Sequence, residues 1–162
     1  MREDQQTELT DSMVQLVCFK LADEEYAVSI TDIQEVIRVG HITPIPQVPP
    51  FALGVINLRG NIVSVFDLRS KLRLQQKEFN HSTKIIVANV EGEVFSFVVD
   101  EILENVTLDN AQIDSAPMVK MTIDKDCVAG LGELQGRMIT ILNLKKVHEN
   151  IKKDMLEYAV YI

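Results

Sequence analysis

Short apolar segments separated by polar turns run along most of the chain. Residues 13–21 form a dense apolar run, and residues 26–30 alternate large and small side chains, as a strand with one buried face does. The polar residues 22–25 between them predict a turn, so the two segments are expected to form a hairpin. A second hairpin is predicted from residues 84–90 and 94–99, which flank Glu91-Gly92-Glu93.

The segment between residues 31 and 54 combines a helix-start signal with several prolines. Thr31 to Gln34 has the Thr-x-x-Gln form of a capping box, which predicts one or two helical turns before an extended stretch at 36–39. Four prolines exclude regular helix between 43 and 49. A short helical turn is predicted over Pro50–Leu53, closed by Gly54.

A positively charged turn follows this segment. Gly60 can adopt backbone angles that are closed to other residues, so residues 57–61 predict a tight turn that displays Arg59. The β-branched run 62–66 predicts a largely buried strand after the turn. Taken alone, the turn allows two interpretations of Arg59, a solvated loop cation or a recognition residue.

The two ends of the chain differ in character. Residues 1–12 have no hydrophobic period and are expected to be a disordered tail. Residues 109–126 are expected to be mostly loop, 138–142 a last strand, and the chain from about Leu144 a helix with apolar residues near helical spacing. The apolar ending 158–162 is expected to pack against the protein, with a binding peptide as the alternative.

The chain contains an internal repeat. Residues 58–69 match residues 134–145 at a shift of 76 (134 minus 58), and Gly54 falls on Gly130 at the same shift. The hairpins match at a shift of 69 (95 minus 26), which places Tyr26 on Phe95 and Glu35 on Glu104. Arg59 has Gln135 as its counterpart and Asn57 has Glu133, so the cationic tip is expected in the first copy only. Because of this difference, a recognition role for Arg59 is as well supported as a plain turn role.

Two copies of a roughly five-stranded unit with little helix predict an all-β fold of two small antiparallel barrels. Several strands are apolar on both faces, so the barrels are expected to pack together and to leave a groove at their junction. One barrel is expected from about residues 16–83 and the other from about 13–15 with 84–150, with the exact strand exchange open. Residues 151–162 are expected to be a C-terminal helix or tail.

Composition excludes several classes of protein. Apolar residues make up 46% and charged residues 25%, as in ordinary globular proteins. The net charge of −8 argues against nucleic acid, which needs clustered Lys and Arg. Cys18 and Cys127 have no metal or redox spacing and are expected to be buried thiols. No segment reaches the ~18 apolar residues that a membrane span needs, so a cytoplasmic location is expected.

No catalytic or metal-binding constellation emerges, so the chain is not expected to be an enzyme or to bind a cofactor. His41, His81 and His148 lack a ligand spacing and are expected at the surface. Asp100 and Glu101 follow a strand and are expected to be a solvated strand exit. The acidic clusters 23–25 and 91–93 are expected to be solvated hairpin tips.

The order of these motifs resembles the CheW family of bacterial chemotaxis coupling proteins over about residues 14–150. The resemblance rests on Asp23-Glu24-Glu25-Tyr26, Ile33-Gln34-Glu35-Val36-Ile37, Gly54 to Gly60, Val65 to Arg69, Val98-Val99-Asp100 and Gly130-Leu131-Gly132. It implies two SH3-like barrels and a non-enzymatic adaptor between the regulatory domain of the histidine kinase CheA and the cytoplasmic tip of methyl-accepting receptors.

The resemblance also implies which residues contact these partners. Receptor contacts are expected at Ile33, Glu35, Val36, Asn57, Arg59 and Val98, and kinase contacts at Gly54 and Lys84. Apolar grooves bind amphipathic helices, and charged hydrogen bonds fix their register. Three alternatives stay open: a coupling protein of a pilus or other non-motility pathway, a detached regulatory domain of another kinase, and a small-molecule-binding β-barrel.

Overall fold

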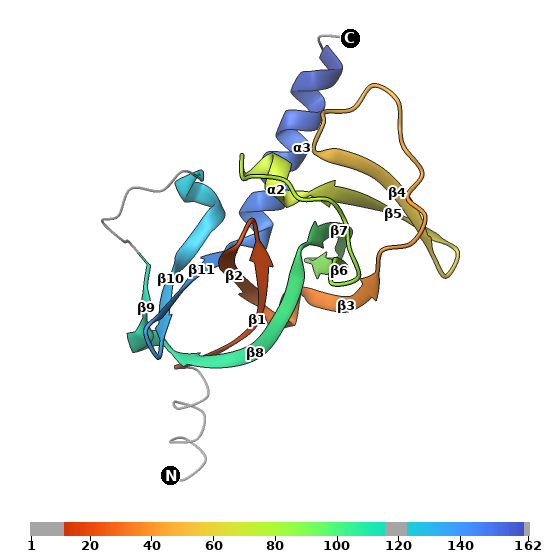
Figure 1. Cartoon of the computed structure of the whole chain (residues 1–162). Helices are drawn as coiled ribbons and strands as arrows, with labels where there is room; N and C mark the ends of the chain where they lie inside the picture. Colours follow the sequence, from red (N-terminus) through yellow and green to blue (C-terminus); the bar gives the residue numbers. More distant parts are fainter. Residues whose placement is uncertain (1–11, 116–122, 161–162) are drawn as a thin grey trace.

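The structure describes residues 12–115 and 123–160 of the chain, in a computed structural model, and contains eleven strands, four short helical segments and one helix of 17 residues in these ranges (Figure 1). The disordered tail expected over residues 1–12 lies almost wholly outside these residues. The strands are β1 Met13–Leu21, β2 Glu24–Ser29, β3 Ile33–Arg38, β4 Ala52–Leu58, β5 Asn61–Asp67, β6 Lys84–Val90, β7 Glu93–Val99, β8 Glu101–Asp109, β9 Ile113–Asp114, β10 Val128–Leu134 and β11 Arg137–Leu142. The helices are η1 Ile30–Asp32, α2 Leu68–Lys71, η2 Asn110–Gln112, η3 Lys125–Cys127 and α3 Leu144–Val160.

The strands form two sheets, and the two sequence copies exchange strands between them. Sheet A has the order β8-β1-β2-β11-β10-β9, and sheet B has the order β3-β6-β7-β5-β4. The hairpin β1–β2 of the first copy therefore lies between β8 and β11 of the second copy, and the hairpin β6–β7 lies between β3 and β5 of the first. The expected division into about residues 16–83 and about 13–15 with 84–150 left the exact strand exchange open, and each sheet takes strands from both ranges.

The all-β prediction is confirmed, with two corrections to the expected barrels. Sheet A has six strands rather than five, because the short strand β9 adds to β10. Each sheet also contains one parallel pair, β2 with β11 and β5 with β7, so neither is purely antiparallel. The parallel pairs arise where a strand of one copy meets a strand of the other.

The largest apolar cluster lies between the two sheets and takes residues from both. Phe19 of β1 and Phe97 of β7, both fully buried, approach to 5.9 Å between ring centroids. Smaller clusters fill the concave side of each sheet, around Leu16 and Ile139 in sheet A and around Val65 and Val98 in sheet B. The prediction that strands apolar on both faces would pack the two units together is thus confirmed.

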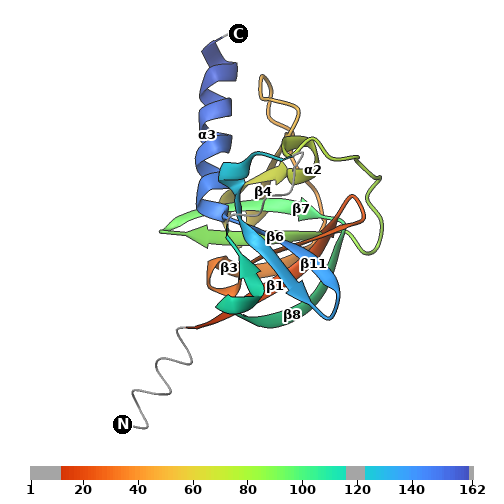
Figure 2. The ribbon, with the colours of Figure 1, turned by 90° about the vertical axis from the view of Figure 1, so that its left-hand side faces the viewer.

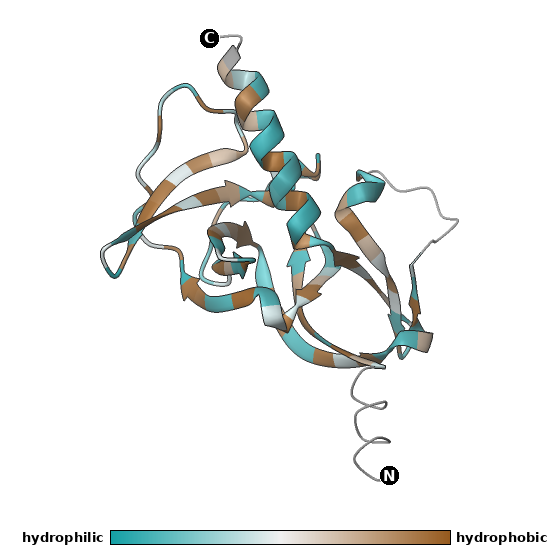
Figure 3. Ribbon diagram, turned by 180° about the vertical axis from the view of Figure 1, so that it is seen from behind, coloured by the Kyte–Doolittle hydropathy of each residue, from teal (hydrophilic) through white to brown (hydrophobic). Residues whose placement is uncertain are grey.

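The C-terminal helix covers the junction of the sheets and then leaves them. Leu144, Val147 and Ile151 of α3 are buried in the central cluster, as their helical spacing predicts. Figures 1 and 2 show the far end of α3 beyond the strands, and teal and brown bands alternate along the helix in Figure 3. Tyr158 is 40% exposed and Ala159 is exposed as well, so these two residues of the expected packed ending lie largely in solvent.

Of the two helical predictions for the segment between residues 31 and 54, the first is partly confirmed and the second is wrong. The helical residues before β3 are a single 3-10 turn over Ile30–Asp32, capped by the Ser29 hydroxyl rather than by Thr31. Residues 50 and 51 form a turn, in which the Ala52 N–H donates to the Pro49 carbonyl at 2.9 Å, and β4 begins at Ala52. Gly54 is therefore part of a strand, at a β-bulge, and does not end a helix.

Candidate partner-binding site

The β4–β5 hairpin holds Arg59 at its tip in a fixed backbone conformation. Arg59 and Gly60 have φ values of 51° and 87°, which correspond to the two left-handed residues of a type I′ turn. The Asn57 side-chain oxygen accepts a hydrogen bond from the Gly60 N–H at 2.8 Å. Asn57 therefore stabilises the turn, and the prediction of a tight turn that displays Arg59 is confirmed. Ile62, expected in a largely buried strand, is 68% exposed just after this turn.

The Arg59 guanidinium is paired with Glu35 of β3. Its Nη1 donates to Glu35 Oε1 at 3.2 Å, and its Nη2 donates to the other carboxylate oxygen. The hydrogen bond from Arg59 lowers the pKa of Glu35. β3 and β4 are the two edges of sheet B, so the pair joins opposite edges of this sheet across its open side. The Arg59 side chain nevertheless stays 68% exposed, whereas that of Glu35 is 23% exposed.

The same arrangement recurs in sheet A with a different arginine. Glu104 of β8 occupies the repeat position of Glu35 and pairs with Arg137, two residues beyond the counterpart of Arg59. Arg137 also pairs with Glu25, and its side chain is 37% exposed. The expectation of a cationic tip in the first copy only is confirmed, because Gln135 occupies the turn position in the second copy, but an arginine–glutamate pair occurs in both sheets. Arg59 has one carboxylate partner and far more exposed surface than Arg137.

The other expected receptor contacts lie in different environments. Val36 on β3 is 41% exposed beside Glu35, and Ile33 at the start of β3 is half-buried against the central cluster. Val98 is fully buried in the cluster of sheet B, so its side chain cannot touch a partner in this structure. The structure thus brings Glu35 and Arg59 together at one edge of sheet B, whereas Val36, the next residue along β3, faces the other side of the strand.

The two expected kinase contacts are separated from each other. Gly54 is buried on β4 with φ of 142°, and a Cβ at this position would stand 2.0 Å from the Thr43 carbonyl oxygen. The Thr43 backbone thus occupies the space into which a side chain at position 54 would project. Lys84 begins β6, at the end of the strand opposite Arg38, and its Nζ donates to the His81 carbonyl at 2.9 Å. Its side chain can reach solvent, whereas Gly54 can act on a partner only through its neighbours.

Sequence reasoning missed a buried ionic cluster between the sheets. Asp100, expected at a solvated strand exit, has a side chain only 13% exposed and bonds Arg69 at 2.7 Å. The alternation of side chains along a strand does not predict the burial of a residue at the crossover between two sheets, and Asp100 lies at such a crossover. The internal repeat offered one signal: the aspartate–arginine pair of Asp67 and Arg69 occurs in the first copy only. Their counterparts in the second copy are the uncharged Asn143 and the lysine Lys145.

Two further expectations concern single side chains. Cys18 and Cys127 are buried thiols, as predicted, and burial raises the pKa of Cys18 to about 11. His148 is not at the surface: its ring stacks on Phe95 at 4.1 Å, and its Nδ1 lies 2.9 Å from a Glu93 oxygen. Burial lowers the pKa of His148. The hairpin tip at 91–93, expected to be solvated, thus makes contacts with α3.

Two open cavities lie away from the expected contact residues. One of about 510 Å³ is lined by Lys20, Asp23, Glu25, Leu103, Glu104 and Arg137, and one of about 430 Å³ lies among α2, η3 and α3. Among the residues that the structure describes, no group of three His, Cys, Asp or Glu side chains is placed to hold a metal ion. In the same part of the chain, no helix combines the length and the hydropathy that crossing a bilayer requires.

Comparison with known proteins gives one consistent result. Residues 15–152 match the family model of the CheW-like domain. The chain is similar to the chemotaxis protein CheW of Klebsiella aerogenes, with 35% identity over 82% of this chain and 80% of the relative. The CheW protein of Helicobacter pylori is 31% identical over 89% of this chain and 85% of the relative. The crystal structure of the scaffolding protein TtCheW from Thermoanaerobacter tengcongensis superposes with a TM-score of 0.76 at 34% identity, covering 80% of this chain and 88% of that chain.

Proposed function

Because the chain belongs to the CheW family of non-catalytic chemotaxis scaffold proteins, we propose that it couples methyl-accepting receptors to the histidine kinase CheA. The receptor would contribute its cytoplasmic tip, and the kinase its regulatory domain. The protein acts in the cytoplasm in this proposal, and it reaches the membrane only through the receptor, without inserting into the bilayer.

The exposed Arg59 side chain is the observation that supports the receptor contact. The type I′ turn fixes its backbone, so little conformational entropy remains to be lost when a partner binds. Its guanidinium has one bidentate partner, Glu35, and the side chain as a whole is still 68% exposed. A helix arriving at this edge of sheet B could take a hydrogen bond from the solvent side of Arg59 or replace Glu35 as its partner. Charge-assisted bonds of this kind fix the register of a helix on a surface.

Exposed apolar side chains on the strands that flank this pair supply the second element of a helix-docking surface. Val36 is 41% exposed on β3, and Ile62, opposite Asn57 in the hairpin, is 68% exposed. Amphipathic helices bind through apolar anchors at helical spacing, with polar groups at the rim. Ile33, Glu35, Val36, Asn57 and Arg59 are therefore retained as the proposed receptor edge, with Asn57 acting through the turn. Val98 supports this edge only from the core.

The kinase contact is proposed at a different surface. Lys84 and the chain around Thr43 lie at the margin of sheet B, and the bulge at Gly54 holds the Thr43 segment in place through two hydrogen bonds of 2.9 Å with Val55. Gly54 would shape this surface without contacting the kinase through a side chain. Two separate surfaces would allow one molecule to hold both partners at once.

The substitution Arg59→Ala tests the receptor contact. We expect binding to receptor-bearing vesicles to weaken by about 10- to 150-fold, since a hydrogen bond to a charged group contributes roughly 1.5–3 kcal/mol. The melting temperature should stay within a degree or two of wild type, because the side chain is exposed. Gln135→Ala is the matched control, since Gln135 occupies the same turn position in the second copy with φ of 51°.

Two results would contradict this assignment. Equal receptor binding by wild type and Arg59→Ala would remove Arg59 from the contact. A large drop in melting temperature with intact binding would show that the pair with Glu35 only closes sheet B. Glu35→Gln separates these cases further, because it breaks the pair and leaves the Arg59 cation in place.

A further inference from the structure

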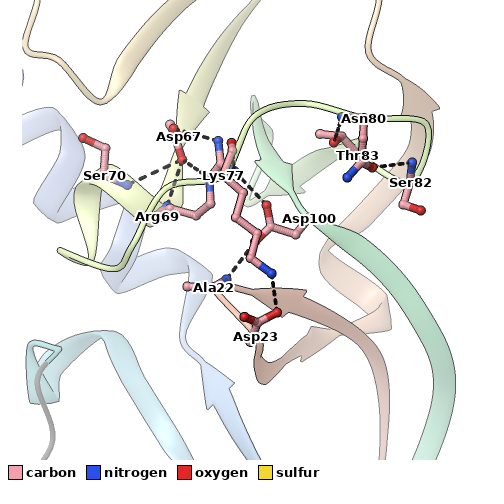
Figure 4. Close-up of polar contacts among 10 residues, drawn as sticks. All are labelled: Ala22, Asp23, Asp67, Arg69, Ser70, Lys77, Asn80, Ser82, Thr83 and Asp100. Carbon is pink, nitrogen blue, oxygen red and sulfur yellow. Dashed lines mark hydrogen bonds and ion pairs between the residues drawn. The ribbon is translucent and has the colours of Figure 1, made fainter.

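Arg69 is a buried arginine whose hydrogen-bonding groups are engaged from several directions. It lies on α2, immediately after β5, and its side chain is 2% exposed. Its Nε donates to Asp67 Oδ1 at 3.0 Å and its Nη2 to Asp67 Oδ2 at 3.2 Å, which is a bidentate contact. Its Nη1 donates to Asp100 Oδ1 and to the Lys77 carbonyl, both at 2.7 Å. Figure 4 shows these contacts converging on Arg69.

Asp100 links the ionic cluster around Arg69 in sheet B to sheet A. It is the single residue between β7, which belongs to sheet B, and β8, which belongs to sheet A. Its Oδ2 accepts a hydrogen bond of 2.7 Å from the Ala22 N–H, in the turn of the β1–β2 hairpin. Its own N–H donates to the Lys20 carbonyl at 3.0 Å. One carboxylate therefore joins Arg69, at the end of β5, to the hairpin of sheet A.

The loop after α2 closes over the cluster and adds a second connection to sheet A. Lys77 accepts the bond from Arg69 through its carbonyl, and its ammonium group pairs with Asp23 in the β1–β2 turn. The Phe79 ring lies 5.5 Å from the Arg69 guanidinium carbon. Farther along the loop, Thr83 accepts a 2.8 Å hydrogen bond from the Asn80 N–H, as Figure 4 shows.

The internal repeat supplies a comparison within the same molecule. The counterparts of Asp67, Arg69 and Asp100 are Asn143, Lys145 and Thr31. Lys145 does reach the hairpin of the other sheet, where it pairs with Glu91 at 3.1 Å, but these side chains are 52% and 68% exposed. Thr31 bonds the Ser29 hydroxyl at the surface. The β7–β8 crossover is thus closed by a buried ionic cluster, and the β2–β3 crossover is not.

We propose that Arg69 and Asp100 are positioning residues that fix the placement of sheet B relative to sheet A. A buried charge that loses its partner is strongly unfavourable, so a displacement of the sheets at this crossover is resisted. The β2–β3 crossover, which leads directly into Ile33 and Glu35, lacks this restraint. The two sheets are therefore held in one relative placement at the Asp100 side, and any adjustment to a partner occurs at the Ile30–Ile33 side.

Distance measurement between the sheets tests the proposal directly. Spin labels are attached at cysteines replacing Ile62 on β5 and Met138 on β11, which are repeat counterparts, 68% and 56% exposed. The native thiols Cys18 and Cys127 are 0% and 2% exposed and stay unlabelled. Asp100→Asn keeps the size of the side chain and removes its charge. Lys145→Ala is the matched control at the counterpart of Arg69.

We expect a narrow distance distribution for wild type and for Lys145→Ala, and a broadened or shifted one for Asp100→Asn. Arg69→Lys, which keeps the buried charge but loses the planar fork, should broaden it as well. This variant decides the question if Asp100→Asn does not fold. An unchanged distribution in a folded variant would overturn the proposal. A role in stability alone would lower the melting temperature and leave the distribution of the folded molecules unchanged.

The functional part of the test depends on the proposed coupling of receptor and kinase. Asp100→Asn should bind the receptor alone and the kinase alone as wild type does. Kinase activation in the three-component assembly should fall, by about tenfold if about a tenth of the variant molecules hold the required geometry. Full activation by the variant would contradict the proposal. Failure of wild type to activate the kinase would instead refute the proposed function, and the distance measurement would still decide the role of Arg69 and Asp100.

Discussion

The substitution Gly54→Ala should be among the most damaging changes of a single methyl group in this chain. Gly54 has φ of 142°, a backbone conformation that side chains rarely adopt, and an added Cβ would stand 2.0 Å from the Thr43 oxygen and 2.7 Å from the Thr43 carbon. Both atoms belong to the backbone, which cannot rotate away as a flexible side chain can. The chain around Thr43 must therefore move.

The cost follows from what that movement breaks. Thr43 and Val55 exchange two backbone hydrogen bonds of 2.9 Å, each worth about 1 kcal/mol net. A side chain in a sparsely populated backbone region adds roughly 1–3 kcal/mol. We expect a loss of about 3–5 kcal/mol in the free energy of unfolding, which corresponds to a fall in melting temperature of roughly 10 °C for a chain of this length.

Two other glycines provide graded controls. Gly60 has φ of 87° with nothing within 4 Å of an added Cβ, so Gly60→Ala should cost only the backbone term of about 1–2 kcal/mol. Gly40 has open space and no positive φ, so Gly40→Ala should lie within about 0.5 kcal/mol of wild type. Urea unfolding of the three variants measures the series. A Gly54→Ala protein as stable as Gly60→Ala would refute the clash argument.

Two further predictions follow from perturbed groups. His148 has a lowered pKa in the folded protein, so its contribution to stability is complete above its unfolded pKa of about 6.5 and is lost as pH falls through that value toward the lower folded pKa. The melting temperature of wild type should therefore fall between about pH 7.5 and about pH 5.5 by more than that of His148→Phe, and equal slopes would contradict this. Cys18 and Cys127 should react with a thiol reagent at about pH 8 only after unfolding, since both are buried and thiolate is the reactive form; rapid reaction of the native protein would show that the core opens.

The local elements could be predicted from the sequence, and the pairing between them could not. Alternation and turn residues place the β1–β2 and β6–β7 hairpins correctly, because both signals act over a few residues. The repeat at Gly54 and Gly130 predicts two related units. It does not show that each unit lends its first hairpin to the other sheet, because sequence shifts compare the copies and contain no information about which strands meet in space.

The candidate site shows the same division. The turn chemistry of Asn57 and Gly60 predicts an exposed Arg59, and this is what the structure has. The partner of Arg59, Glu35, lies 24 positions away on the opposite edge of the sheet, and only the curvature of sheet B brings the two edges together. Val98 could not be recognised as inaccessible, since both faces of β7 are covered by packed layers.

The buried charges were the least predictable feature. Asp100 follows a strand and resembles any acidic strand exit in sequence, but it lies at the crossover between the sheets, beneath the loop that contains Lys77. Arg69 and its counterpart Lys145 both follow a strand at the start of a helix, so their sequence surroundings are alike. The Arg69 side chain is nevertheless 2% exposed and the Lys145 side chain 52% exposed, and the sequence pattern does not distinguish them. Burial of this kind is a property of the assembled sheets.

Sedimentation of receptor-bearing vesicles with purified CheA, in the presence and absence of this protein, tests the central claim most directly. The account predicts that this protein sediments with the vesicles and that the amount of CheA in the pellet rises when it is added. Arg59→Ala should reduce both amounts, and Gln135→Ala neither. Failure of wild type to bind either partner at concentrations on the order of tens of micromolar would contradict the account.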